Sequence, residues 1–236
     1  MALPIFFIKD YNPFAGLTEL DEDTSRHVVQ VLRMKEGESI SLADGKGNLV
    51  TAAIATPHKK HCTVSITSRQ YIEPQQRRTA IAISLLKNTN RFEWFLEKAA
   101  ELGIQEIIPL LCERTAKEHF RRDRMQGILV SAMLQSQQAW LPVLQEPVPF
   151  NDWTASQLAY QQKFIAHCEE ADNKKVLREQ LDFSLSCVIA IGPEGDFSPA
   201  EIKQALEKNF APVSLGATRL RTETAGVAAA VWMSNQ

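Results

Sequence analysis

The sequence predicts an α/β protein in which a small β-barrel precedes a larger domain built on a mostly parallel sheet. Three observations lead to this fold class. Up to about residue 70, the chain is rich in strand-forming segments and contains one helix. A polar, proline-containing stretch at 69–78 then has the composition of a linker. Beyond it, apolar strands alternate with helices, a pattern typical of parallel sheets with helices on both faces.

The expected barrel domain covers residues 1–70. Its strands are predicted at 3–8, 39–43, 49–55 and 62–67, and the sequence Asp-Gly-Lys-Gly-Asn at 44–48 is a strong turn signal. One helix interrupts the strands. Asp21 or Asp23 caps it, Gly37 follows its end, and the valine and leucine residues at 28, 29, 31 and 32 give it an apolar side.

The expected second domain covers residues 71–236. Apolar strands are predicted at 80–86, 106–111, 163–168 and 187–191. Helices are predicted at 91–102, where Gly103 provides the C-terminal stop, at 121–135 and at 173–181. Ligands usually bind at the carboxyl edge of such a sheet, so the segments that follow its strands are of most interest.

Composition narrows the function classes. With 44% hydrophobic residues, 23% charged residues and a net charge of −2, the chain is globular and has no global positive field to attract a polyanion. Because its start lacks a charged leader and a long apolar segment, we expect a cytosolic protein. The scattered cysteines form no metal-binding pattern, and we expect all four to be buried free thiols: Cys62, Cys112, Cys168 and Cys187.

The predicted strand at 187–191 leads directly into a glycine-bearing turn, Gly192-Pro-Glu-Gly195. Ser198, Pro199 and Glu201 then form a capping box with proline at the first helical position, so a helix begins there. The glycines permit close approaches of a ligand that side chains would block. Taken alone, however, such a tetrapeptide is more often a simple tight turn than a binding loop.

A second glycine-bearing segment favours the interpretation of the first as a binding loop rather than a simple turn. It follows a short strand and places Arg221 and Glu223 just before an alanine-rich apolar helix at 225–233. Capping by Thr222 or Thr224, with Glu223 in the first turn, explains part of the pattern. It does not explain Arg221, because a positive charge near a helix N-terminus is unfavourable unless a negative charge is bound or develops nearby.

Together, these two segments resemble the paired signature of the ribosomal RNA small subunit methyltransferase E family. The first is Ile191-Gly-Pro-Glu-Gly-Asp-Phe-Ser198, and the second is Leu215-Gly-Ala-Thr-Arg-Leu-Arg-Thr-Glu-Thr-Ala225. Upstream segments resemble other motifs of the family in order and spacing, so that the likeness covers nearly the whole chain. These are Arg26-His27 with Val31-Leu32-Arg33 and Gly37, and Lys87 with Glu97-Lys98 and Glu101-Leu-Gly103.

The resemblance implies a fold and an activity. The barrel at 1–70 would be a PUA-like RNA-binding domain, and residues 71–236 would form a SPOUT methyltransferase domain with a deep C-terminal trefoil knot. A homodimer would use S-adenosyl-L-methionine to methylate the N3 atom of one uridine in 16S (small-subunit) rRNA, acting on the assembled small subunit. The base would leave its stack to reach the methyl group.

The chemistry of N3 methylation suggests the catalytic residues, and the resemblance implies the residues that hold the cofactor. We expect Arg221 to stabilise the negative charge of the deprotonated uracil, with Glu223 or Glu194 as the proton acceptor or as the group that orients Arg221. No metal site is expected. The cofactor-binding residues would be Gly192, Pro193, Glu194, Gly195, Leu215, Gly216, Leu220, Thr222 and Thr224.

RNA contacts are expected from four basic residues: Arg26, Arg33, Lys87 and Arg91. For Arg33, an ion pair with an acidic neighbour is an equally supported alternative. The sequence departs from the family pattern twice. Leu134-Gln-Ser-Gln-Gln138 replaces the usual Glu-Gln-Ser-Gly-Arg, which removes a charged pair, and Asp196 replaces the second of two usual glycines in the cofactor loop.

Other functions remain open at this point. A Rossmann-type methyltransferase is disfavoured, because its glycine-rich loop follows the first strand, whereas the glycine turns here come near the end of the chain. A knotted methyltransferase that acts on tRNA or on a ribose hydroxyl is not excluded. Neither is an RNA-binding module that has lost catalysis. Identification of the methylated nucleoside and an activity assay separate these alternatives.

Overall fold

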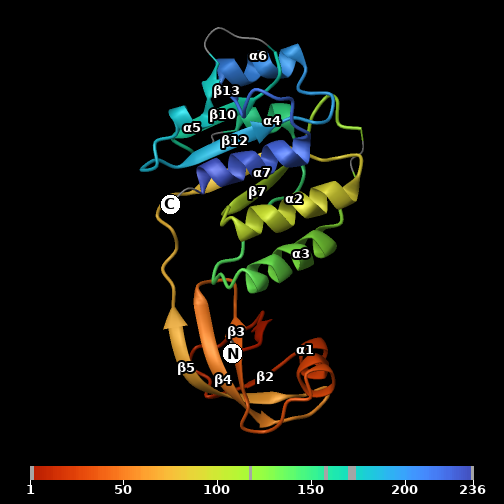
Figure 1. Cartoon of the computed structure of the whole chain (residues 1–236), viewed down its shortest axis with the longest axis vertical. Coiled ribbons are helices and arrows are strands. Elements are labelled where there is room, and N and C mark those ends of the chain that lie inside the picture. Colours follow the sequence, from red (N-terminus) through yellow and green to blue (C-terminus); the bar gives the residue numbers. More distant parts are fainter. Residues whose placement is uncertain (1–2, 117–118, 157–158, 170–173, 235–236) are drawn as a thin grey trace. The chain divides into compact units, whose positions relative to one another are not determined.

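The computed structural model describes residues 3–116, 119–156, 159–169 and 174–234. Its internal contacts divide the chain into two compact units, and Figure 1 labels most of their elements. The first unit comprises Met1–Pro74 together with Met133–Leu141. The second comprises Gln75–Ala132 and Pro142–Gln236.

The first unit is a curled five-stranded sheet with the strand order β1-β3-β4-β5-β2. β1 pairs with β3 in parallel, and the other neighbours are antiparallel. Its core combines alternate strand residues, such as Ile40 and Val64, with Val28 of the helical segment, and all three are fully buried. The strands are β1 (Ile5–Phe7), β2 (Leu17–Glu19), β3 (Ser39–Ala43), β4 (Asn48–Thr56) and β5 (Thr63–Tyr71).

The helix in this unit is shorter than predicted. Asp21 caps α1 (Glu22–Arg26), because its Oδ1 accepts a hydrogen bond from the backbone N–H of Thr24 at 2.9 Å. A π-helical turn at His27–Val31 follows. Its wider geometry rotates the chain, so that Val31 and Leu32 are 66% and 42% exposed. The predicted apolar side of this helix was therefore wrong at these two positions.

The segment Met133–Leu141 packs on the sheet of the first unit. Trp140 Nε1 donates to the carbonyl oxygen of Ile72 at 2.9 Å, and the Trp140 ring meets Tyr71 edge-on, with 6.2 Å between ring centroids. Gly47 lies against both rings at φ +98°, where a Cβ atom would come within 2.8 Å of Trp140. Glycine is thus required at this turn for both conformation and space.

The second unit contains an eight-stranded sheet in the order β11-β13-β10-β12-β6-β7-β8, and β9 also pairs with β7. All strand pairs described in it are parallel, as predicted. Its strands are β6 (Thr79–Ser84), β7 (Glu106–Leu111), β8 (Val143–Leu144), β9 (Val148–Pro149), β10 (Gln162–Ala166), β11 (Lys175–Val176), β12 (Cys187–Ile191) and β13 (Ala211–Ser214).

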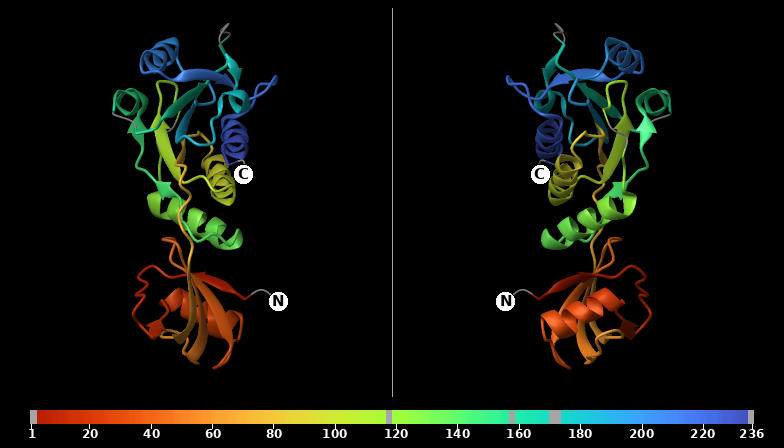
Figure 2. Two further views of the ribbon diagram at one scale, coloured as in Figure 1. Left: turned by 90° about the vertical axis from the view of Figure 1, so that its left-hand side faces the viewer. Right: turned by 90° about the vertical axis from the view of Figure 1, so that its right-hand side faces the viewer.

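Helices cover both faces of this sheet, as Figure 2 shows. On one face, α2 (Thr89–Glu101) packs against α7 (Thr222–Met233). On the other face, α4 (Phe150–Ala155) packs against α6 (Pro199–Glu207). The predicted capping box of α6 is present, since Ser198 Oγ accepts from the Glu201 N–H and the Glu201 carboxylate accepts from the Ser198 N–H. The remaining helices are α3 (Arg122–Gln135) and α5 (Leu177–Gln180).

The prediction of a helix at 173–181 was wrong in part. Residue 173 lies outside the described residues, Lys175–Val176 is a short edge strand, and only Leu177–Gln180 is helical. Four short elements had no prediction, namely β2, β8, β9 and α4. Each spans six residues or fewer. Such a segment shows no clear period, so tertiary pairing decides its conformation.

Three of the four cysteines are buried free thiols as predicted, but Cys168 is exposed because it lies just beyond the end of β10. Within the described ranges, no group of histidine, cysteine and carboxylate side chains is arranged to hold a metal ion. Among the helices formed by these residues, none is long and apolar enough to cross a membrane.

Candidate functional site

A cavity of about 540 Å³ lies at the carboxyl edge of the parallel sheet. Its walls come from the loops that follow β12 and β13, and from the end of β10, which lies between these two strands. Because the three strands are parallel, the segments that leave them emerge side by side. The volume is in the range of small-molecule sites. The two glycine-bearing segments therefore do meet at one site.

Glycine at 192 is required by packing. A Cβ atom there would lie 3.1 Å from the backbone nitrogen of Phe197 and 3.1 Å from its ring, and Phe197 is almost completely buried. A side chain at this position would displace the loop or Phe197. Gly216, in the other loop, has φ +134° and open space around it, so its role is conformational rather than steric.

Arg221 stands at the N-cap of α7 with its side chain on the cavity wall. Its side chain caps no backbone N–H and, within the described part of the chain, makes no hydrogen bond or ion pair, whereas its carbonyl oxygen accepts from the Ala225 N–H at 2.7 Å. The predicted capping by Thr222 or Thr224 was wrong, because Arg221 occupies the cap position. An unpaired guanidinium beside a helix N-terminus is what a site for an anion or a developing negative charge requires.

The two candidate carboxylates differ in their surroundings. Glu194 is exposed on the cavity wall, and its Oε1 accepts a hydrogen bond from the backbone N–H of Lys87 at 3.1 Å. Glu223 is only 7% exposed and is not part of the wall. Its Oε1 lies 3.6 Å from Arg91 Nε, and its Oε2 has no hydrogen-bond partner among the described residues. Of the two, Glu194 is the one that a bound molecule can reach.

Most of the predicted cofactor residues line the cavity, but Gly195 and Thr224 do not. The carbonyl oxygen of Gly195 instead accepts from Arg114 Nη1 at 2.8 Å, and Thr224 is exposed. The predicted residues that do line it are Gly192, Pro193, Glu194, Leu215, Gly216, Leu220, Arg221 and Thr222, together with Arg91.

A second, more open cavity of about 570 Å³ adjoins the first. Lys87 and the N-terminal residues of α2 line it, and it shares Arg91 and Glu194 with the first cavity. Two of the predicted RNA contacts, Lys87 and Arg91, are therefore brought together with Glu194 and Arg221 in the second unit.

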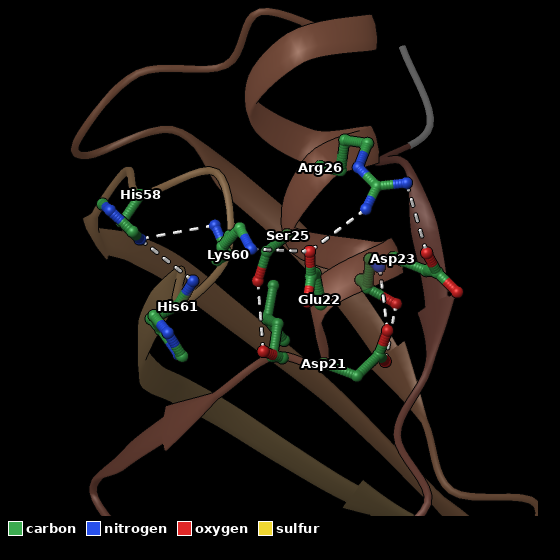
Figure 3. A network of polar contacts seen from close by, with 10 residues as sticks. Asp21, Glu22, Asp23, Ser25, Arg26, His58, Lys60 and His61 are labelled. Carbon is green, nitrogen blue, oxygen red and sulfur yellow. Dashed lines mark hydrogen bonds and ion pairs between the residues drawn. The ribbon is translucent and has the colours of Figure 1, made fainter.

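The other two predicted RNA contacts belong to the first unit. Figure 3 shows Arg26 turned toward two acidic residues of its own helix, Glu22 and Asp23, at 3.2 and 3.5 Å. Lys60 also approaches Glu22 at 3.4 Å. Such exposed pairs are weak, so they do not prevent Arg26 from exchanging its partner for a phosphate. Arg33 is exposed, adopts φ +55°, and forms no ion pair with the residues that the structure describes.

The sequence did not single out His167, Cys168 or Lys174, which all line the first cavity. Sequence reasoning missed His167 and Cys168 because the predicted strand ran to residue 168, whereas β10 ends at Ala166 and thereby places both residues at the carboxyl edge of the sheet. His167 is only 8% exposed, and neither of its ring nitrogens has a hydrogen-bond partner among the described residues.

We expect His167 to make stability depend on pH. Burial, and then the charge of Lys174, lowers the pKa of its imidazole below the ordinary 6.5, and the carboxylates of Asp196 and Glu169 oppose this only partly. The unfolded chain therefore binds a proton at a pH where the folded chain does not. The free energy of unfolding then falls as the pH drops below about 6.5.

Thermal unfolding at about pH 7.5 and about pH 5.5 tests this expectation. The melting temperature of His167→Gln should fall less between the two than that of the wild type. His58→Gln, which alters an exposed histidine of the first unit, is the control. Equal pH dependence of the wild type and His167→Gln would contradict the expectation.

Comparison with known proteins defines the class. A family model described as an RNA methyltransferase domain matches residues 73–234, and one described as an RNA methyltransferase PUA domain matches residues 20–67. The chain therefore belongs to the RNA methyltransferase family, and its predicted fold class, an α/β domain with a parallel sheet preceded by a PUA-like barrel, is confirmed.

Individual relatives make the family more specific. The chain is 31% identical to the ribosomal RNA small subunit methyltransferase E of Synechocystis over 84% of its own length and 66% of the relative. A probable rRNA methyltransferase from Porphyromonas gingivalis has a similar structure, with a TM-score of 0.89 at 36% identity over 98% and 97% of the two chains. The ribosomal RNA small subunit methyltransferase E of Neisseria gonorrhoeae was solved with bound S-adenosylmethionine. Its structure has a TM-score of 0.87 at 28% identity, over 98% of this chain and 97% of that one. The predicted family is confirmed.

Proposed function

We propose that this chain transfers a methyl group from S-adenosylmethionine to the N3 atom of a uridine in small-subunit rRNA. The observation that carries this proposal is the first cavity, where two glycine-bearing loops and an unpaired arginine meet at the carboxyl edge of a parallel sheet. Relatives that share the fold over nearly the whole chain are named for small-subunit rRNA methylation, and one was solved with S-adenosylmethionine.

The first cavity suits the methyl donor. Ile191, Val213 and Leu220 provide apolar surface for an adenine ring, and the two loops offer backbone groups for the polar parts of the molecule. S-adenosylmethionine supplies a methyl group that is already activated by a sulfonium. The residues of the chain therefore need only bind the donor, align the uridine with it and exclude water.

Arg221 has the principal role in the transfer. The N3 atom of uracil carries a proton at neutral pH, and its removal leaves negative charge shared with the neighbouring carbonyl oxygens. A guanidinium fixed at the cavity wall stabilises that charge and thereby favours the nucleophilic form. No other side chain needs to release Arg221 first, because it has no partner among the described residues.

Glu194 is the better candidate for the proton acceptor. A general base must come within hydrogen-bond distance of the proton that it removes, and Glu194 lies on both cavities, whereas Glu223 lies on neither. The Lys87 N–H holds the Glu194 carboxylate in place. Glu223 instead orients Arg91, which lies between the two cavities.

The second cavity would receive the nucleotide. Lys87 and Arg91 would bind phosphates next to a uridine turned out of its stack, and Glu194 and Arg221 would flank its base. The barrel at 1–70 would also bind the RNA, through Arg26 and Arg33. We further propose a cytosolic location, because small ribosomal subunits are there, and assembled subunits as the substrate.

A homodimer and a C-terminal trefoil knot in 71–236 also belong to the proposal. A partly exposed side of α7 supports the dimer, since Val231 is 46% exposed while Ala229, Ala230 and Met233 are buried against the unit's own core. The sheet order supports the knot, because β13 lies beside β10 and β11 rather than beside β12, the strand that precedes it in the chain.

Methylation of defined RNA tests this function. Purified protein and S-adenosylmethionine should convert one uridine of small ribosomal subunits, taken from a strain that lacks the modification, to 3-methyluridine. Mass analysis of the nucleosides from the subunit, from free rRNA and from tRNA identifies both product and substrate. Calorimetry with S-adenosylmethionine on the same sample reports donor binding separately.

A ribose-methylated product, or transfer to tRNA, would replace the proposal with a related methyltransferase activity. Donor binding without any transfer would instead indicate a module that has lost catalysis. Transfer to free rRNA but not to subunits would contradict the assembled subunit as the substrate.

A further inference from the structure

The Asp196 carboxylate joins two segments of the cavity wall. Its Oδ2 accepts a hydrogen bond from the backbone N–H of Cys168 at 2.7 Å, and its Oδ1 accepts one from the N–H of Phe197 at 2.8 Å. Cys168 lies just beyond β10, and Asp196 lies in the loop after β12. We call this pair of hydrogen bonds the Asp196 clasp. Its bond to Cys168 connects residues that are 28 positions apart in the sequence.

The backbone at Asp196 would suit glycine better. Its φ of +65° lies in the left-handed region, which disfavours side chains because of contacts with the Cβ atom. The family signature that the sequence resembles has glycine at this position. Aspartate therefore accepts a backbone strain that glycine avoids, and what it adds is the carboxylate of the clasp.

The clasp holds a wall of the donor cavity. His167, Cys168 and Asp196 all line that cavity. The Lys174 ammonium, which also lines the cavity, donates to the carbonyl oxygens of His167 and, at 3.1 Å, of Glu169. The Lys174 contacts lie within the segment after β10, whereas the clasp connects this segment to the loop of the neighbouring strand.

We propose that Asp196 is a positioning residue that sets the end of β10 in its binding geometry before the donor arrives. A wall that is already ordered loses less conformational freedom on binding, so the clasp raises affinity for the donor. The methyl transfer step itself does not depend on it, because Asp196 holds only backbone groups. This inference rests on the proposed function, since it assigns the cavity to S-adenosylmethionine.

Asp196→Gly tests the inference, because it removes both hydrogen bonds and the backbone strain together. We expect the Kd for S-adenosylmethionine, measured by calorimetry, to rise about 10-fold. The kcat at saturating donor should change by less than about 2-fold. Hydrogen exchange of the Cys168 amide should become faster in the variant without donor.

Asp196→Asn is the conservative variant. Its amide oxygen can accept one of the two N–H groups, so its Kd should lie between those of the wild type and Asp196→Gly. Asp182→Asn is the matched control. Asp182 likewise accepts a backbone N–H, that of Ser184 at 2.9 Å, but it lies near the amino ends of β10 and β12, away from the cavity.

Unchanged donor affinity and unchanged Cys168 exchange in Asp196→Gly would overturn the inference. A lower kcat with unchanged Kd would overturn it as well. If Asp196→Gly does not fold, a wild-type Kd in Asp196→Asn would count against the clasp, and a raised Kd would support it. Failure of the wild type itself to bind S-adenosylmethionine would instead refute the proposed function.

Discussion

Arg221→Ala will lower kcat for methyl transfer by at least about 100-fold, the typical loss when one group that stabilises developing negative charge is removed. The side chain lies on the wall of the first cavity, and it makes no hydrogen bond or ion pair with the described residues that would have to be broken. The fold should be unaffected, because Arg221 caps α7 through its backbone alone. Removing a positive charge from a helix N-terminus is, if anything, slightly favourable.

Two further variants separate the effect of the position of the charge from the effect of the charge itself. Arg219→Ala removes an exposed cation from the same wall, and it should reduce kcat far less if position rather than charge matters. Arg221→Lys keeps the charge but lacks the planar fork, and partial activity is expected. The assay uses saturating donor and small ribosomal subunits, with calorimetry as the check on donor binding. Full activity of Arg221→Ala would remove this residue from the mechanism, and a loss explained by Kd alone would reassign it to donor binding.

Gly226→Ala will destabilise the second unit by about 2 kcal/mol. Alanine normally stabilises a helix interior by about 1 kcal/mol relative to glycine. Here its Cβ atom would lie 2.6 Å from Phe95 Cε2 and 3.0 Å from Ile83 Cδ1, and neither neighbour is exposed at all. Overpacking of such an enclosed site costs up to about 3 kcal/mol and exceeds the gain. Gly226 therefore sets how closely α7 approaches α2.

The matched control is Gly127→Ala. Gly127 lies in the interior of α3, and a Cβ atom there would meet nothing within 4 Å, so alanine should stabilise by about 1 kcal/mol. Thermal unfolding of the two variants and the wild type should therefore give shifts of opposite sign. If both variants melt above the wild type, the contact between α7 and α2 is looser than the structure indicates.

Local patterns in the sequence determined much of the fold. The strands at 106–111 and 187–191 were predicted to the residue, because a short, largely apolar run in a chain of alternating strands and helices has few alternatives. The start of α6 was predicted for the same reason, since Ser198, Pro199 and Glu201 satisfy its first N–H groups among themselves. Where the signal was short or irregular, as in the π-helical turn at His27–Val31, tertiary contacts decided the outcome.

The two departures from the family pattern show what local patterns in the sequence do not reveal. Gln137 and Asp196 both stand where the pattern has glycine, and both adopt positive φ, at +56° and +65°. Both residues thus adopt a backbone conformation that glycine would adopt more easily. The sequence reveals the substitutions, but it does not show that the carboxylate of Asp196 has a partner 28 residues away.

The sequence by itself determined most of the longer elements and their order, and that two glycine-bearing loops follow strands near the end of the chain. Only the tertiary structure decided which loops meet, because the position of β10 between β12 and β13 depends on strand pairing across long stretches of chain. It also decided that Glu194 faces the cavity and Glu223 does not. The physical reason is that capping, turns and periodicity act between near neighbours, whereas a site is assembled by contacts between residues far apart in the chain.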